Sequence, residues 1–356
     1  MPRRPALAAL AALAVTALAP AATAAEPVDI TYGYHPYWTG GWHGVIIKAR
    51  ELWREHLPEG SEVTFEAHLT GPPMVNALLS GKMQIGTMGD MPSFVATARR
   101  EIDDVRLVSV PMLSEGQNCN KILVRADAPE FGSVEEAMAW LDGRPFAVHR
   151  GTCANRFVEA IIDKGAFQPS RLNTLSIEVI ASSFEAGKLD AAAMWEPHAA
   201  RAVTQGHARY VATGAPWDEK DANFTLMRQQ FIEAHPEAAA GWLQAEIEAV
   251  RFMIERPADT VAILQDALTD YDAETIRRAL YVANDAAIGG AEVNYIGQFT
   301  FDDEVQALMA EGYAFLHRID VLRSGEVPAN AYNDAPLRAA LAELGLEAPV
   351  GVITGE

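Results

Sequence analysis

Apolar and polar residues alternate with two different periods up to residue 213. Residues 28–34 and 62–68 alternate residue by residue and predict strands, whereas the apolar residues of 45–56 share one helical stripe and predict a helix. Further strands are predicted at 83–88, 105–111, 121–125, 145–149, 175–180, 189–195 and 209–213, with helices at 74–80, 93–100, 133–141, 156–164, 182–186 and 199–205. This order predicts an α/β protein built on doubly wound sheets.

Beyond residue 229 the hydrophobic pattern becomes helical. Segments 236–255, 257–267, 273–283 and 302–319 repeat apolar residues at the helical spacing. Before them, 221–227 predicts one strand that returns to the first part of the chain. The C-terminal part is therefore expected to be mainly helical.

Two stretches with the same order of features predict two similar lobes. Residues 78–92 are LLSGKMQIGTMGDMP, and 184–197 are FEAGKLDAAAMWEP. Each has a helix end, a Gly-Lys turn, an apolar strand and a polar loop before a proline. Open α/β sheets bind ligands outside the carboxyl ends of their strands. These loops are therefore expected to face one cleft, with Gly89, Asp90 and Met91 on one side and Trp195 and Glu196 on the other.

The two motifs resemble those of the nitrate/sulfonate/taurine-type periplasmic solute-binding proteins of ABC importers, over residues 28–210. The resemblance implies a type II periplasmic binding protein fold, with two doubly wound sheets around a cleft and a helical C-terminal part. Lobe 1 would comprise 26–122 and 217–356, and lobe 2 would comprise 123–216. The chain would be a monomer without a cofactor, and would deliver its ligand to a membrane permease.

Gly151 and Thr152 form the strongest candidate for an anion site. They lie between a predicted strand and a helix, where free N–H groups and the helix dipole favour negative charge. In the family, this position resembles the loop that grips the anionic head group. An ordinary capped helix start would give the same pattern.

Other candidate positions also follow predicted strands. Tyr34, His35, Tyr37 and Trp38 form an aromatic loop that can surround a ligand or pack in the core. Asp90 and Glu196 can accept hydrogen bonds from a ligand amine, or stabilise helix starts. The remaining candidates are Thr70 and Gly71 after the second strand, and Gln117 and Asn118 near the expected crossover between lobes.

Cys119 and Cys153 are the two cysteines of the chain. An oxidising compartment would permit a disulfide between them, and two free thiols are the alternative. At a helix N-terminus, Cys153 could also be a reactive thiol. Histidines and cysteines lack metal-ligand spacing, and the sequence contains neither a GxSxG motif nor a Walker loop. No metal site or enzyme is therefore predicted.

The N-terminus and the net charge bear on location and partners. Arg3 and Arg4 precede an apolar run, and Ala22-Thr23-Ala24 fits a cleavage site, so residues 1–25 are predicted to be a signal peptide for export to the periplasm. The formal net charge of −20 argues against nucleic acid and anionic lipid as partners.

The predicted ligand is a small organic anion such as an alkanesulfonate or taurine. The candidate anion site at Gly151 and Thr152 favours a negatively charged group. The aromatic loop argues against bare nitrate, which would need a small polar site. A thiamine-pyrimidine precursor or a cationic ligand is the alternative, because aromatic walls would stack on such a molecule. The alternative from another class is a pyridoxal-phosphate-dependent pyrimidine synthase. The chain departs from that family, because it lacks a cysteine-rich iron motif.

Overall fold

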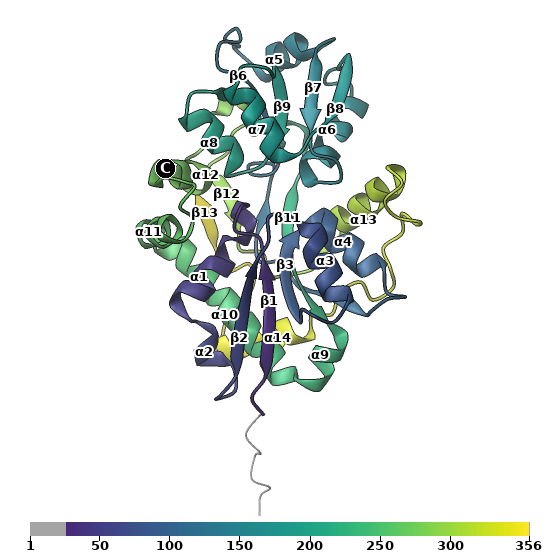
Figure 1. The fold of residues 1–356 in the computed structure, drawn as a ribbon, viewed down its shortest axis with the longest axis vertical. Helices are drawn as coiled ribbons and strands as arrows, with labels where there is room; N and C mark the ends of the chain where they lie inside the picture. Colours follow the sequence, from purple (N-terminus) through teal and green to yellow (C-terminus); the bar gives the residue numbers. More distant parts are fainter. Residues whose placement is uncertain (1–25, 356) are drawn as a thin grey trace, which may run out of the picture.

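The computed structural model describes residues 26–355, so the predicted signal peptide lies outside the described residues. Two β-sheets lie one above the other along the longest axis of the molecule, and helices flank both of them (Figure 1). The eight-stranded sheet is the lower one in that view, and the five-stranded sheet is the upper one.

The large sheet has the order β13-β12-β5-β11-β3-β1-β2, with β4 paired to β11. Its strands are β1 (Asp29–Tyr34), β2 (Glu62–Ala67), β3 (Ile85–Gly89), β4 (Val105–Ser109), β5 (Leu113–Ser114), β11 (Asp221–Arg228), β12 (Val293–Ile296) and β13 (Val352–Thr354). β1 runs parallel to β2 and β3, and β11 is antiparallel to β3. The three parallel strands therefore end at the same edge of the sheet.

The small sheet has the order β10-β6-β9-β7-β8. Its strands are β6 (Lys121–Arg125), β7 (Pro145–Val148), β8 (Arg171–Thr174), β9 (Ala191–Met194) and β10 (Ala208–Ala212). β7 is parallel to β8 and β9, whereas β6 is antiparallel to β9. The chain changes sheets between β5 and β6 and again between β10 and β11. The lobe boundaries given above remain a prediction.

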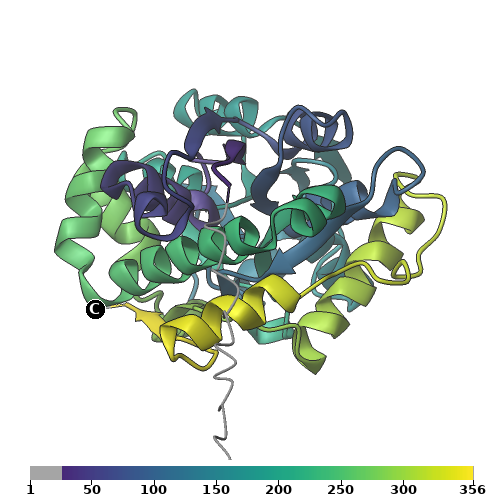
Figure 2. The same ribbon diagram turned by 90° about the horizontal axis from the view of Figure 1, so that it is seen from below.

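Helices cover both sheets. They are α1 (Trp42–Arg50), α2 (Trp53–His56), α3 (Gly71–Leu79), α4 (Asp90–Ala98), α5 (Val134–Leu141), α6 (Cys153–Asp163), α7 (Ile177–Glu185), α8 (His198–Thr204), α9 (Gln229–Ala234), α10 (Pro236–Glu255), α11 (Pro257–Ala267), α12 (Ala273–Tyr281), α13 (Asp303–Arg318) and α14 (Ala335–Leu344). Short 3-10 turns are η1 (Thr39–Gly41), η2 (Ala215–Trp217) and η3 (Ala286–Ile288). From below, α14 lies alongside α10 (Figure 2).

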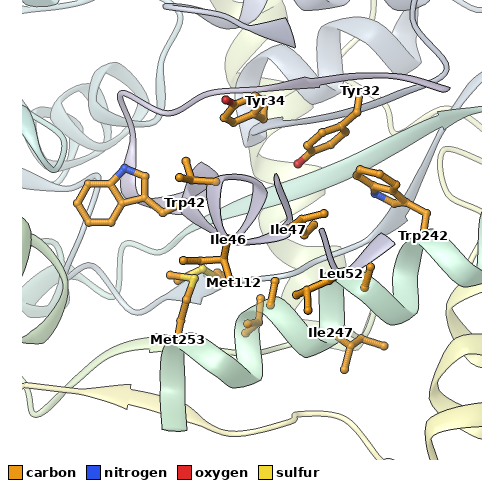
Figure 3. Close-up of a cluster of buried hydrophobic side chains, with 14 of the residues drawn as sticks. Tyr32, Tyr34, Trp42, Ile46, Ile47, Leu52, Met112, Trp242, Ile247 and Met253 are labelled. Carbon is orange, nitrogen blue, oxygen red and sulfur yellow. The ribbon is translucent and has the colours of Figure 1, made fainter. Parts of the chain in front are cut away.

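Two hydrophobic cores lie against the large sheet, which with its helices forms the large lobe. A third core lies in the small lobe, which is formed by the small sheet and its helices. One large-lobe core joins β1 to α1 and α10, and Figure 3 shows Tyr32 and Tyr34 of β1 above Ile46 of α1, with Tyr32 next to Trp242 of α10. The other large-lobe core contains the apolar faces of α3, α4 and α13. Burying each large side chain contributes about 1.5–3 kcal/mol, so these cores hold the strand ends firmly.

Two sequence predictions are wrong in their local details. The single helix predicted over 45–56 is interrupted at Glu51, whose left-handed φ of 53° separates α1 from α2. The strand predicted over 175–180 is mostly helix α7, which begins after Ser176, whose side chain accepts a hydrogen bond from the Val179 N–H. This cap satisfies a free N–H of the first turn and favours the helix. Within residues 26–355, no helix is long and apolar enough to cross a membrane.

Candidate ligand-binding cleft

A cleft of about 360 Å³ lies between the two sheets. Its walls come from the carboxyl ends of parallel strands and the loops that follow them: His35 and Trp38 after β1, Thr70 and Gly71 after β2, Gly89 at the end of β3 with Asp90 after it, His149 to Cys153 after β7, and Trp195 after β9. Both sheets therefore contribute strand-end loops, as expected for ligand sites in open α/β sheets. The volume lies within the usual range for sites that hold small organic molecules.

Helix α6 begins at the cleft with unused N–H groups. Thr152 caps the helix by accepting a hydrogen bond from the Asn155 N–H at 3.2 Å. Gly151 precedes this cap with a φ of 73°, a left-handed conformation that favours glycine. The first N–H groups of a helix have no acceptor within it, so those of Cys153 and Ala154 can donate to an anion. Arg150, which also lines the cleft, adds positive charge beside them.

Helices α3 and α4 begin side by side on the opposite wall. A Cβ added to Gly71 would lie 2.4 Å from the Pro92 Cβ, so only glycine permits this close approach. Pro72 and Pro73 occupy the first turn of α3, and Pro92 that of α4. Proline has no N–H. These two helix starts therefore offer few donors, although both line the cleft.

Two tryptophans form aromatic walls with free hydrogen-bond donors. The six-membered ring of Trp38 lies over two glycines, with its Cη2 atom 2.5 Å from a Cβ added to Gly40 and 3.7 Å from one added to Gly89. Trp195 lies 5.8 Å from His149, ring centre to ring centre. Among the described residues, neither indole N–H has a hydrogen-bond partner, although both rings are at least nine-tenths buried. Such a donor costs free energy unless a ligand or water accepts from it.

Burial controls the charges in the cleft. Desolvation lowers the pKa of His35 to about 4 and also lowers that of His149, so both rings are neutral at pH 7. Desolvation raises the pKa of Asp90 to about 6, while the nearby Arg156 opposes this shift. At neutral pH the cleft therefore combines the cations Arg99 and Arg150 with one ionised carboxylate.

A family model agrees with this architecture. The model described as the NMT1-like family matches residues 23–265, more than half of the chain. The chain belongs to the NMT1-like family. Among its relatives, a Bacillus subtilis (strain 168) protein named for binding aliphatic sulfonates is 24% identical over 240 residues, covering 66% of this chain and 69% of the relative. The taurine-binding periplasmic protein of Escherichia coli (strain K12) is 23% identical, covering 65% and 69%.

Solved structures share the fold of this NMT1-like chain. The alkanesulfonate-binding protein SsuA from Xanthomonas axonopodis pv. citri, bound to MOPS, matches with a TM-score of 0.68 at 19% identity, covering 87% of this chain and 99% of that one. The periplasmic nitrate-binding protein NrtA from Synechocystis PCC 6803 matches with a TM-score of 0.69 at 14% identity, covering 92% and 91%. The chain therefore has the type II periplasmic binding protein fold, with two sheets around a cleft.

Most of the candidate residues in this NMT1-like chain line the cleft. They are His35, Trp38, Thr70, Gly71, Gly89, Asp90, Gly151, Thr152, Cys153 and Trp195. The sequence pattern placed them together because each lies at or after the end of a predicted strand of a doubly wound sheet. Their roles in binding remain predictions.

Three other candidates lie in or against the hydrophobic cores rather than at the cleft. Tyr34 is stacked on Tyr32 with the ring centres 5.8 Å apart, and Tyr37 packs against the same core. Met91 is fully buried in the core formed by α3, α4 and α13. Apolar burial explains these three positions without a ligand.

The remaining three candidates have polar partners within the protein. Gln117 donates to the Gly289 carbonyl at 3.1 Å, and Asn118 contacts the Thr39 hydroxyl. Glu196 accepts hydrogen bonds from the Ala200 N–H at 2.7 Å and from the Tyr210 hydroxyl at 2.6 Å. Burial raises the pKa of Glu196, while Lys121 opposes this shift. These contacts favour structural roles over ligand binding.

Several residues line the cleft although the sequence pattern did not identify them. They are Val75, Asn76, Val95, Arg99, His149, Leu316 and Val321. Pro72, Pro92 and Arg150, which belong to the predicted cleft loops, line it as well. His149 directly precedes Arg150, and its position at the end of a predicted strand could have identified it. Leu316 and Val321 approach the cleft from α13 and the turn after it, and no local pattern points to them.

The disulfide left open by the sequence is present. Cys119 and Cys153 are bonded, with their Cα atoms 6.1 Å apart. Cys119 lies in the segment that crosses from the large sheet to the small one, and Cys153 is the first residue of α6. The bond therefore ties the start of the candidate anion-binding helix to the crossover, and it excludes a free thiol at Cys153 in this structure.

The two lobes contact each other around the cleft. The Thr39 N–H donates to the Glu196 carbonyl at 3.1 Å, and Arg150 donates to the Ile319 carbonyl at 2.6 Å. Behind the cleft, the Thr204 and Thr275 hydroxyls are 2.9 Å apart. These contacts join the two lobes in this structure.

Proposed function

We propose that this protein is the solute-binding component of an ABC importer and captures a small organic anion with a sulfonate head group. The observation that carries the proposal is a set of unused donors around one closed cleft. The N-terminus of α6 offers free N–H groups beside Arg150, and the indole N–H groups of Trp38 and Trp195 lack partners within residues 26–355. A sulfonate has three acceptor oxygens and one negative charge, and such a group matches these donors.

Capture would occur by closure of the lobes. A solute that contacts strand-end loops from both sheets stabilises the closed arrangement through contacts that the open form lacks. The closed form would then dock on a membrane permease. Relatives named for binding sulfonates and taurine support this ligand class, and solved structures of the same fold include proteins named for binding alkanesulfonates and nitrate. Export to the periplasm and a monomeric state belong to the same proposal.

A calorimetric titration panel tests the ligand class. The probes are propane-1-sulfonate, taurine, sodium nitrate and a neutral propanol control, each titrated into the mature chain from residue 26. At least one sulfonate should bind with a dissociation constant below about 100 μM, and nitrate should bind far more weakly because it cannot reach both walls of a cleft of about 360 Å³. Absence of binding by both sulfonates would contradict the proposed function.

A further inference from the structure

The two walls of the cleft have opposite polar character. On the small-lobe side, α6 begins with free N–H groups, has no acidic residue in its first turn and is preceded by Arg150. On the large-lobe side, α3 and α4 have prolines in their first turns, and these prolines lack N–H groups. Donors therefore concentrate at one end of the cleft.

Asp90 is the acidic residue at the donor-poor end. It lines the cleft and is 1% exposed. Its Oδ1 atom accepts from the Met91 N–H at 2.7 Å, which removes one of the few donors that α4 could offer a ligand. Its Oδ2 atom is buried and has no hydrogen-bond partner in the described part of the chain. A buried carboxylate oxygen without a partner is costly, and a cationic donor would offset that cost.

We propose that Asp90 accepts a hydrogen bond from the ammonium group of a zwitterionic sulfonate, whose sulfonate end lies at the N-terminus of α6. The inference rests on the proposed function and narrows its ligand class from alkanesulfonates to aminosulfonates. The walls between the two ends suit such a ligand, since the faces of Trp38 and Trp195 attract a cation as well as an apolar body. The cleft volume of about 360 Å³ lies within the usual range for sites that hold small organic molecules.

Two ligands of nearly the same shape allow the contribution of the ammonium group to affinity to be measured. Taurine and propane-1-sulfonate differ by the exchange of an ammonium for a methyl group. In calorimetry at pH 7.5, taurine should bind the natural chain at least about tenfold more tightly, because a hydrogen bond to a charged group is worth about 1.5–3 kcal/mol, or about 10–150-fold. Asp90→Asn should abolish this preference and leave propane-1-sulfonate within about threefold of its original affinity.

A control variant separates the contact from general electrostatics. Glu178 is an exposed acid on α7 that acts on His149 through space. Glu178→Gln removes one negative charge near the cleft without touching Asp90, so the taurine preference should persist. Thermal unfolding of both variants checks their fold. If Asp90→Asn does not fold, the pH series on the natural chain provides the test.

The pH series depends on which groups titrate near Asp90. The Arg156 guanidinium on α6 acts on Asp90 through space, and Asp221 on β11, with a pKa raised to about 8, is largely neutral below pH 7. His35, whose pKa is lowered to about 4, stays neutral down to pH 6, and desolvation also lowers the pKa of His149. The pKa of Asp90, about 6, therefore dominates between pH 7.5 and 5.5.

The sign of the pH effect distinguishes the outcomes. An ammonium needs the ionised carboxylate, so taurine affinity should be nearly full at pH 7.5, about half of that at pH 6 and severalfold lower by pH 5.5. The affinity for propane-1-sulfonate should stay constant or rise. Equal affinities for both ligands, with no effect of Asp90→Asn, would overturn this inference while the importer function stands. Failure of both ligands to bind the natural chain would overturn the function as well.

Discussion

At the residue scale, Trp195 can act both as an aromatic wall and as a hydrogen-bond donor, and the sequence alone does not distinguish these two roles. Its ring forms a wall of the cleft, and its indole N–H has no partner within the described chain. A buried donor that stays unsatisfied in the folded protein costs about 1–3 kcal/mol. We therefore interpret the N–H as a group reserved for the ligand, while the ring packs between His149 and His198.

Replacement of Trp195 by phenylalanine tests this interpretation. Trp195→Phe keeps an aromatic wall but removes the donor, so the affinity for propane-1-sulfonate should fall about tenfold. Trp195→Ala also removes the wall and should weaken binding further. The control is Trp140→Phe on α5, where the ring packs on Phe131 outside the cleft. Calorimetry that finds equal affinities for Trp195→Phe and the natural chain would remove the indole N–H from the binding contacts.

At the element scale, the start of α6 depends on one backbone conformation. Gly151 has a φ of 73°, and a Cβ added there would meet no atom within 4 Å. The constraint is therefore conformational rather than steric. A residue other than glycine costs about 1–2 kcal/mol in this region, and a β-branched residue is especially unfavourable. The loop would relax by shifting the first N–H groups of the helix.

Gly151→Val should therefore weaken sulfonate binding by more than tenfold. Gly187→Val is the matched control, because Gly187 has a φ of 64°, also has no atom within 4 Å of an added Cβ, and lies outside the cleft lining. Both variants should lower the thermal midpoint by similar amounts, whereas only Gly151→Val should lose affinity. Equal affinities for the two variants in calorimetry would mean that α6 does not hold the anion.

The helices and strands also show which parts of the cleft could be predicted from the sequence. The loops after β1, β2, β3, β7 and β9 were placed together because each strand could be recognised from its own residues. The strand prediction was wrong at 175–180. The residues Leu-Ser-Ile-Glu-Val-Ile alternate between apolar and polar as in a strand, but Ser176 caps helix α7 there. The sequence pattern also missed Leu316 and Val321, because only tertiary packing brings α13 and its following turn to the cleft. The N–H groups without a hydrogen-bond partner could likewise be found only from the structure, since a sequence does not show which N–H groups lack acceptors.

At the scale of the whole molecule, contacts both at the cleft and behind it join the lobes. The Thr204 hydroxyl on α8 lies 2.9 Å from the Thr275 hydroxyl on α12, and Arg201 of α8 lies over the ring of Tyr271. α8 follows β9 of the small sheet, whereas α12 belongs to the part of the chain that follows β11 of the large sheet. Any opening that moves α8 away from α12 must break the hydroxyl contact. The distance between these two positions therefore reports closure.

Paired cysteines at these positions should convert closure into a covalent signal. In the variant Thr204→Cys with Thr275→Cys, mild oxidation should form a disulfide faster when taurine or propane-1-sulfonate is present, because the ligand increases the closed population. The two single variants control for adventitious oxidation, and the native Cys119–Cys153 bond is present in all of them. Once cross-linked around a ligand, the protein should release it far more slowly, since escape requires the lobes to separate. If a ligand that binds in calorimetry leaves the cross-linking rate unchanged, that result would mean that binding does not drive closure and that the ligand is captured in a rigid cleft.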